Sequence, residues 1–242
     1  MADLAADPGT YFPNAPLKEV AFEVRFNPLL KIERDIARFQ EGITQEYPLL
    51  GKEVTLTDGE QGSTFLFHTA DKRKTIRASV RSFGLSTTGY HHFPPFREEL
   101  LEKTNVFCHC YDVTSFTRVG LRYINNIEVP ERQGAYDFTE LVYPHLNLQR
   151  VSAKDIQKMA QEIVLTRKTG ALAIRSGLLP LPPVPGREEK KAVYILDLDF
   201  YTETVTPLEQ LSGLVATFHD EIEREFLSQV TKSMVRIMKG EG

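Results

Sequence analysis

Arginine side chains at alternate positions of extended segments are the residues of this sequence best suited to chemistry. Arg118 and Arg122 lie in the run S-F-T-R-V-G-L-R-Y-I-N-N-I-E-V-P, at 115–130, in which polar and apolar residues alternate. Such alternation predicts a strand with one face on the core and the arginines on the other. Because a guanidinium can hold a phosphate or a carboxylate by two hydrogen bonds, this face predicts an anion site. The predicted ligand-binding residues are Arg77, Arg81, Arg118, Arg122 and Arg175, with Glu19 and Glu23 among them and Arg73 beside them.

Two carboxylates offer a second kind of chemistry. Asp197 and Asp199 occupy alternate positions of the run L-D-L-D. On one strand face they could bind a hard cation, or divide the roles of general acid and general base. No third carboxylate stands at a fixed spacing from them, and no glycine-rich phosphate loop lies nearby. The plainer interpretation of both carboxylates and arginines is a ladder of salt bridges, or a face that packs on another subunit.

The remaining reactive residues form no catalytic or metal-binding motif. The segments Cys108–Cys110 and Tyr90–His92 lack the second pair of ligands that structural zinc needs. The sequence contains no G-x-S-x-G elbow, Walker loop or H-E-x-x-H motif. His219 lies beside an apolar helical stripe, so we interpret it as a boundary residue with a hydrogen bond rather than as a general base. We therefore expect no cofactor, and the sequence leans away from an enzyme without deciding the question.

The composition is that of an ordinary globular protein. The 242 residues are 41% hydrophobic and 26% charged, with a formal net charge of −4. No apolar run reaches the roughly 18 residues of a membrane span, and no secretory signal is expected. The two cysteines are too close together to staple a fold, which favours a reduced, cytoplasmic setting. The negative charge argues against unspecific binding of nucleic acid, although it allows a local basic patch.

The first part of the chain divides into an arm, 1–15, and a first α+β half, 16–112. Alternation of apolar residues predicts its strands, and apolar residues at helical spacing predict its helices. Asp58-Gly59, Asp71-Lys72 and Gly84 are the turn residues that separate four short strands. The expected elements are a strand over 16–26, a helix over 31–47, strands near 52–57, 62–69, 73–81 and 83–91, and a helix over 94–109.

The second α+β half, 113–242, repeats this pattern. Residues 179–190 are rich in proline and predict an exposed loop. Thr206-Pro207-Leu208-Glu209 has the form of a capping box and predicts the start of a long helix. The expected elements are a strand over 115–130, helices over 137–146 and 153–160, strands near 161–168, 170–178 and 192–201, and the long helix from 207 onward.

Each half thus reads strand, helix, several strands, helix, and the first strands align without gaps as E-V-A-F-E-V and R-V-G-L-R-Y. This indicates a duplicated α+β unit; the alternative is a single irregular α+β domain. The order resembles the repeat of the TATA-box-binding-protein-like fold, in which two copies share one curved antiparallel sheet with helices on one face, a likeness that implies no function. If the first strands pair antiparallel about a pseudo-twofold axis, Glu19 should oppose Arg122. By the same symmetry Glu23 should oppose Arg118.

Several stretches of the sequence also point to a family. P-N-A-P-L-K-E-V-A-F-E-V-R-F at 13–26, R-V-G-L-R-Y-I-N-N-I at 118–127, and L-D-L-D followed by F-H-D-E-I-E-R-E-F resemble a sporadically distributed, uncharacterised bacterial family of chains of this length. The resemblance covers essentially the whole chain. It implies a bacterial, cytoplasmic protein, and it supplies no activity, cofactor or catalytic residue.

The function that the sequence predicts is that of a non-enzymatic bacterial binding protein. Its arginine-lined sheet face, centred on Arg118 and Arg122, would recognise an anionic small molecule, a nucleotide or an acidic protein surface. Nucleic acid is a partner that the net charge does not favour, and no membrane partner is expected. Two alternatives stay open: a divalent-metal-dependent hydrolase or nuclease that uses Asp197 and Asp199, and a structural homo-oligomer such as a homodimer.

Overall fold

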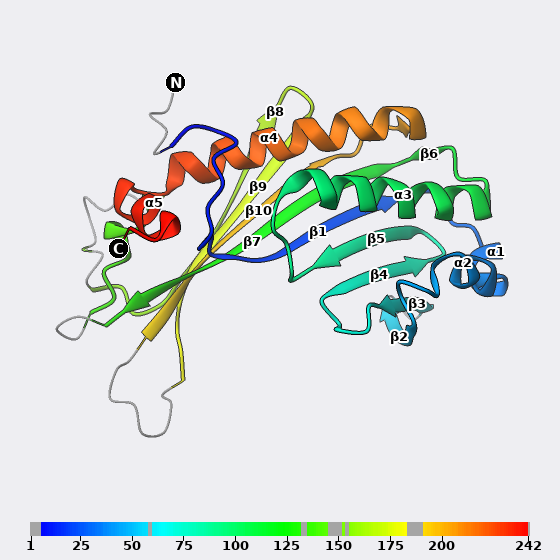
Figure 1. Cartoon of the computed structure of the whole chain (residues 1–242), viewed down its shortest axis with the longest axis horizontal. Coiled ribbons are helices and arrows are strands. Elements are labelled where there is room, and N and C mark those ends of the chain that lie inside the picture. The colour runs from blue at the N-terminus through cyan, green and yellow to red at the C-terminus, as the bar shows by residue number, and fades with distance from the viewer. Residues whose placement is uncertain are drawn as a thin grey trace.

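One large antiparallel sheet dominates the structure, a computed structural model that describes residues 6–57, 60–131, 135–144, 152, 155–182 and 191–241. Its nine strands are β1 (Leu17–Arg25), β2 (Leu49–Thr57), β3 (Glu60–His68), β4 (Lys74–Ser79), β5 (Ser82–Thr87), β7 (Arg118–Pro130), β8 (Met159–Arg167), β9 (Gly170–Pro180) and β10 (Lys191–Thr202). They lie in the order β2-β3-β4-β5-β1-β7-β10-β9-β8 (Figure 1), and every neighbouring pair is antiparallel. The predicted α+β class is confirmed.

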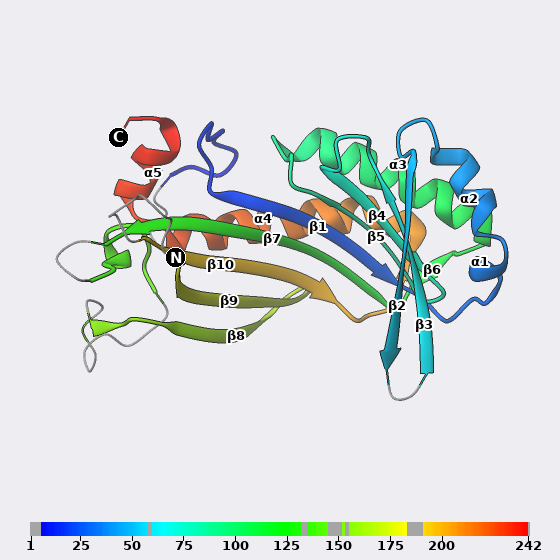
Figure 2. The ribbon, with the colours of Figure 1, turned by 90° about the horizontal axis from the view of Figure 1, so that it is seen from below.

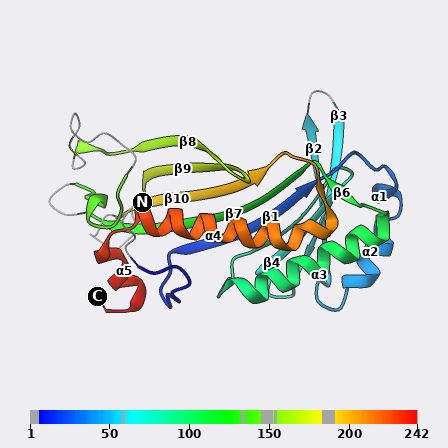
Figure 3. The same ribbon diagram turned by 90° about the horizontal axis from the view of Figure 1, so that it is seen from above.

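Two long helices accompany the sheet. The helices are α1 (Lys31–Arg34), α2 (Ile36–Ile43), α3 (Phe93–Tyr111), α4 (Leu211–Gln229) and α5 (Lys232–Lys239), with short 3-10 turns at Phe138–Glu140 and Leu208–Gln210. The helix α3 contacts β5, and α4 contacts β7 and β10. Figure 2 shows both helices on the same side of the sheet, while the β2–β3 hairpin and β8 bend away from them. Viewed from above in Figure 3, α3 and α4 both cross in front of the strands.

The core lies between the strands and these helices. Val20, Phe22 and Val24 of β1 are buried, and they alternate with more exposed residues as the sequence predicts. Phe39 of α2 packs edge-on against Phe83 of β5, at 5.8 Å between ring centroids. Burial of such aromatic side chains supplies much of the driving force for folding.

The strands β1 and β7 meet at the junction between the two parts of the chain, and they pair antiparallel as predicted. Their predicted register is wrong by two residues, however. Glu19 lies opposite Ile124, and Glu23 lies opposite Gly120. The pairing shifts at an irregularity between Leu17 and Glu19, a feature that symmetry of the two sequences does not reveal.

Gly84 lies inside β5 and not in a turn, which corrects one predicted boundary. The turn falls at 80–81, between β4 and β5. Gly84 is opposite Glu23 of β1, and a Cβ atom at this position would lie 2.7 Å from the carbonyl oxygen of Phe22. The glycine therefore allows the close approach of two strand backbones.

The predicted helices of both halves also need correction. The helix expected over 31–47 is divided at Asp35, whose backbone (φ −118°, ψ 27°) is not helical, and it ends at Ile43. Of the region 137–146, the described part forms only the 3-10 turn Phe138–Glu140. The strand β8 already begins at Met159, inside the helix expected over 153–160.

Two further boundaries differ from the sequence prediction. The strand expected over 115–130 is divided at Thr117 into β6 (Ser115–Phe116), which pairs with β11 (Thr206–Pro207), and β7. Thr206 accordingly belongs to a strand and donates its hydroxyl hydrogen to the carbonyl of Thr204, so the predicted capping box does not form.

The chain segments expected to be loose are partly held in place. In the arm, the N–H of Gly9 donates to Glu223 at 2.9 Å, and the N–H of Asn14 donates to the carbonyl of Met238 at 3.0 Å. The Pro-rich loop begins later than expected, because β9 continues to Pro180. Its remaining part, 183–190, lies outside the described residues, as does the predicted turn Asp58-Gly59.

Gly84→Ala should destabilise the fold by roughly 1–3 kcal/mol, because the new methyl group collides with backbone rather than with a flexible side chain. Gly213→Ala in α4 is the matched control, since a Cβ there meets no atom within 4 Å. It should stabilise the helix by about 0.5–1 kcal/mol. Urea denaturation of the two variants and the wild type measures both effects, and equal stabilities would contradict this account of Gly84.

Candidate functional site

Five charged side chains meet on the sheet face that bears no α3 or α4, here called the outer face. They are Arg118 and Arg122 of β7, Arg175 of β9, and Asp197 and Asp199 of β10, and we call them the arginine–aspartate cluster. Their strands are neighbours, and the register places Asp199 opposite Arg122 and Asp197 opposite Arg175. Strand alternation turns the flanking apolar residues of each strand to the core and these five to the outer face.

The strongest interaction of the cluster is a two-point contact between Arg122 and Asp197. The guanidinium donates from Nε to Oδ1 at 2.7 Å and from Nη2 to Oδ2 at 2.6 Å. The Asp197 side chain is only 6% exposed, whereas that of Arg122 is 43% exposed. The carboxylate is therefore buried beneath the arginine, and the pKa of Arg122 is raised chiefly by this hydrogen bonding.

Arg118 forms a weaker set of contacts at the edge of the cluster. Its Nη1 donates to Glu23 at 3.2 Å and its Nη2 to Asp199 at 3.5 Å. The guanidinium also lies 4.9 Å from the ring centroid of Tyr201. Gly120 makes room for it, because a Cβ there would come within 2.7 Å of Nη1. The side chain of Arg118 thus folds back along its own strand.

Arg175 completes the cluster from the other side. Its Nε donates to Glu162 of β8 at 2.7 Å, and its Nη1 lies 3.6 Å from Asp197 and 3.7 Å from Asp199. Burial raises the pKa of Asp199, an effect that outweighs the attraction of Arg118, Arg175 and Arg122. The positive charges of the cluster are therefore matched by carboxylates that lie close to them.

Of the other predicted ligand-binding residues, Glu23 contacts the cluster through Arg118, whereas Arg77, Arg81 and Glu19 do not join it. Arg77 of β4 pairs with Glu53 of β2, and Arg73 lies 3.9 Å from Asp71. Arg81 is exposed in the turn after β4. Glu19 contacts none of the arginines directly, although its charge contributes to the raised pKa of Arg122.

Asp197 and Asp199 are poorly placed to bind a metal ion. Both carboxylate oxygens of Asp197 already accept hydrogen bonds from Arg122. Across the residues that the structure describes, no group of three or more His, Cys, Asp or Glu side chains could hold a metal ion.

Burial raises the pKa of Cys108 to about 12, which keeps this thiol protonated and unreactive.

On the helix-covered face of the sheet, hydrogen bonds link Tyr90, Tyr123 of β7 and His219 of α4. The sequence did not reveal this arrangement. The hydroxyl groups of Tyr90 and Tyr123 are 3.2 Å apart, and the Tyr123 hydroxyl lies 3.0 Å from Nδ1 of His219. Phe93 stacks on the imidazole at 3.8 Å between ring centroids. Burial lowers the pKa of His219 to about 4, against a small opposing effect of Asp220. This arrangement fits a neutral, structural histidine, as the sequence indicated.

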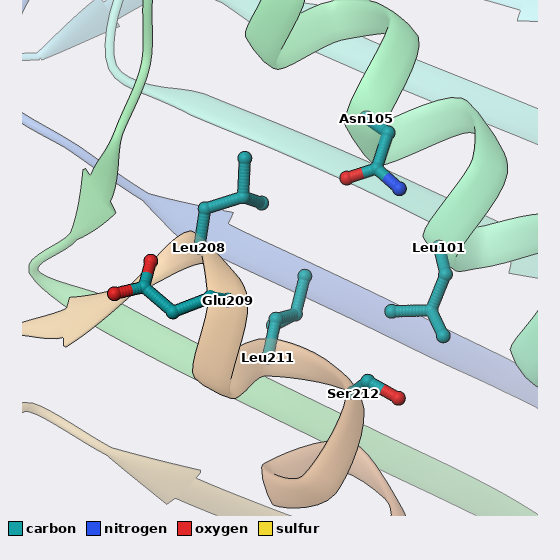
Figure 4. A pocket seen from close by; sticks show the side chains of 6 residues that line it. All are labelled: Leu101, Asn105, Leu208, Glu209, Leu211 and Ser212. Atoms are coloured by element: carbon teal, nitrogen blue, oxygen red, sulfur yellow. The ribbon is translucent and has the colours of Figure 1, made fainter.

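Two hollows lie away from the cluster. One, of about 410 Å³, opens between α3 and the start of α4, and three leucines and three polar or charged side chains line it (Figure 4). The other, of about 310 Å³, includes Lys74 and Glu99, which neutralise each other at 2.6 Å. Neither hollow brings free charged groups together. The first is lined by Leu101, Asn105, Leu208, Glu209, Leu211 and Ser212.

Comparisons with known proteins add no family to this picture: no family model matches the chain, and no curated protein does. The resemblance to a bacterial family therefore stays a prediction. Its two most specific motifs form β1 and β7, the paired strands at the junction of the two parts of the chain. Among the described residues, no helix is both long and apolar enough to cross a membrane.

The Arg122–Asp197 pair should respond asymmetrically to truncation. Arg122→Ala leaves a buried carboxylate without its main partner, and we expect a loss of about 3–5 kcal/mol in the free energy of unfolding. Asp197→Ala leaves a half-exposed guanidinium that water can solvate, so the loss should be about 1 kcal/mol. Urea denaturation measures both variants. Equal losses would contradict the view that the aspartate is the buried partner.

His219 should make the stability of the protein depend on pH. The folded state disfavours the imidazolium, with a pKa of about 4 against 6.5 for the free side chain. Between these values the unfolded chain binds more protons, so stability falls as the pH decreases from 6.5 toward 4, by roughly 2–3 kcal/mol from this group. His219→Phe keeps an aromatic ring against Phe93 and should remove that part of the pH dependence. Thermal denaturation of both proteins at several pH values measures this effect. If the stability of His219→Phe falls with decreasing pH as steeply as that of the wild type, the prediction is wrong.

Proposed function

We propose that the chain is a binding protein without catalytic activity, and that the arginine–aspartate cluster on its outer face recognises an anionic ligand or an acidic surface of a partner. The observation that carries this proposal is the convergence of three arginines from two non-adjacent strands of one sheet onto the buried Asp197 and the half-buried Asp199. A small molecule, a nucleotide and an acidic protein surface share the required chemistry. Nucleic acid fits less well, because the net charge of the chain is −4.

The depth of the charged groups supports this proposal. The aspartates lie beneath the guanidinium groups of Arg122 and Arg175, with side chains 6% and 14% exposed for Asp197 and Asp199. Arg122 and Arg175 are 43% and 41% exposed. A ligand that approaches the outer face therefore meets the guanidinium groups of Arg122 and Arg175 first, whereas Arg118, at 15% exposed, lies as deep as Asp199.

The hydrogen bonds that hold Arg122 also prepare it for a ligand. The contact with Asp197 uses Nε and Nη2, and it fixes the plane of the guanidinium. Within the part of the chain that the structure describes, Nη1 of Arg122 donates to no protein acceptor. A guanidinium whose orientation is already fixed loses less conformational entropy on binding, so its free donors bind an anion more effectively.

We further propose that the chain consists of two repeated α+β halves that share the sheet, with their long helices on one face. The strand order supports this, because β1, β5, β4 and β3 follow one another outward from the junction in the same way as β7, β10, β9 and β8. In each half, a long helix follows the strands along the chain: α3 comes after β5, and α4 comes after β10. A shared sheet of this kind leaves the outer face available to a partner.

The metal-dependent hydrolase is the less supported alternative. It needs Asp197 to exchange Arg122 for a cation, which would cost two charge-assisted hydrogen bonds. It also needs a third ligand, which the described residues do not place near these two aspartates. Measurement of the Tm with and without Mg²⁺ or Mn²⁺ tests this alternative, which requires the ion to raise the Tm of the wild type and not that of Asp197→Asn.

Anion binding should depend on the balance between the arginines and Asp197. Inorganic pyrophosphate, a nucleoside triphosphate and a polyglutamate peptide serve as probes, and at least one should raise the Tm of the wild type. Asp197→Ala removes a competing negative charge and also the two hydrogen bonds that fix Arg122, so these effects oppose each other and the variant should still respond to the probe that stabilises the wild type. Arg118→Ala and Arg122→Ala, added to Asp197→Ala, should abolish this response without leaving a buried, unpaired aspartate.

Arg77→Ala is the matched control, because it removes an outer-face arginine that lies outside the cluster. It should leave the response to each probe unchanged. The proposal is wrong if no probe stabilises the wild type, or if the triple variant responds as Asp197→Ala does.

A further inference from the structure

The edge strand β8 is covered less than any interior strand of the sheet. None of its nine residues is buried, and exposed residues alternate with partly exposed ones along its whole length. Val164 is 55% exposed, although it is a β-branched apolar residue in the middle of the strand. On the other face, Met159 and Leu165 pack on the core but stay only partly buried. The apolar side chains of β8 thus lack cover on the side away from β9.

The sequence of β8 has few of the features that keep edge strands apart, because its two charged residues, Glu162 and Arg167, already pair with Arg175 and with Glu221 and Glu225. Met159–Arg167 contains no proline, glycine or lysine, the residues that commonly weaken or charge a sheet edge. The opposite edge strand β2 carries Gly51 and Lys52. Within the described residues, no strand pairs with the free side of β8.

The sheet is shorter on this side by one strand. Beyond β1 it continues through β5, β4, β3 and β2, whereas beyond β7 it continues only through β10, β9 and β8. The position next to β8 therefore corresponds to the one that β2 occupies at the other end. A strand placed there would cover the exposed apolar side chains.

We propose that a second copy of this chain fills this position, with two β8 strands paired antiparallel about a twofold axis at Val164. In this register the two Val164 side chains meet on the outer face, and Ile163 faces Leu165 on the other. Glu162 lies opposite Thr166 and diagonal to Lys168 of the second copy, an attraction of opposite charges. The two nine-stranded sheets would then continue into each other across the axis.

The neighbouring registers are less favourable, which is why the axis falls at Val164. With Glu162 on the axis, two carboxylates face each other, and like charges directly opposite destabilise a strand pair. With Ile163 on the axis, Val164 faces Glu162. With Leu165 on the axis, Ile163 faces Arg167. The Val164 register sets Val164 against Val164 and Ile163 against Leu165, so it pairs more apolar residues with each other than the Ile163 and Leu165 registers do. Unlike the Glu162 register, it places no like charges opposite each other.

The buried amide of Gln161 agrees with this register. Its Oε1 is buried and has no hydrogen-bond partner within the described residues. With Val164 on the axis, Gln161 lies opposite Arg167 of the second copy, whose guanidinium has donors to spare beyond its contacts with Glu221 and Glu225. This proposal does not depend on the anion-binding function, because the cluster contributes no residue to the contact.

Light scattering coupled to size-exclusion chromatography, at low and high micromolar concentrations, tests the proposal. We expect the wild type to have the mass of a dimer at the higher concentration. Val164→Lys places two lysines on the axis and should give a monomer at both concentrations. Val54→Lys is the matched control, because Val54 is 53% exposed in the middle of β2, and it should remain dimeric.

A charge-reversal experiment identifies the partner strand. Val164→Glu alone should also be monomeric, while an equimolar mixture of Val164→Lys and Val164→Glu should form a dimer, since a lysine and a glutamate then meet on the axis. Circular dichroism checks that each variant is folded. The proposal is wrong if the wild type is monomeric or if only Val54→Lys disrupts the dimer. It is also wrong if the mixture of Val164→Lys and Val164→Glu stays monomeric.

Discussion

The contact between Arg122 and Asp197 is the interaction on which the rest of the outer face depends. A carboxylate that is 6% exposed needs a partner of opposite charge, and Arg122 supplies it through two hydrogen bonds. The pair joins β7 to β10, whose apolar residues on the other face pack on α4. Because a slip of one residue would turn Asp197 into the core, this pair also fixes the register of the two strands.

The proposed function would place two requirements on the cluster that usually conflict. Arginines that bind an external anion must stay available, whereas buried aspartates must be neutralised. Asp197 and Asp199 lie deeper than Arg122 and Arg175, whereas Arg118 is as buried as Asp199, so under the proposed function Arg122 and Arg175 would meet both requirements. Gly120 contributes to this arrangement, because the absence of a side chain lets Arg118 lie flat over the strand. The small residue at the junction of the two parts of the chain thus has a role in the site as well as in the sheet.

The sequence predicted the strands better than the helices, and the reason is physical. Alternation in β1, β7 and β10 reflects one face on the core, so strands and their inward residues could be read directly. The helix break at Asp35 and the extended start of β8 at Met159 depend on tertiary contacts that override local periodicity. The small helix α5 was missed, although Thr231 caps it through the N–H of Met234 and Gly240 ends it in a left-handed conformation.

The site was predictable in its residues but not in its geometry. Alternation placed Arg118, Arg122 and both aspartates on one face, but which arginine meets which carboxylate depends on the register of non-consecutive strands. The predicted β1–β7 register was wrong by two residues, so Glu23 lies opposite Gly120 and not opposite Arg118. The ion pair between Glu23 and Arg118 still forms, but diagonally across the two strands. Arg77 and Arg81 share the residue type of the cluster without its location, because β5 and β1 separate β4 from β7.

The junction of β1 with β7 has a consequence for how the chain folds. The ion pair across it connects residues 95 positions apart, whereas the hairpins β8–β9 and β4–β5 connect near neighbours. Closing so long a loop costs entropy before any of the contacts form, and contacts between distant residues slow folding. We therefore expect the hairpins β8–β9 and β4–β5 to form before β1 pairs with β7.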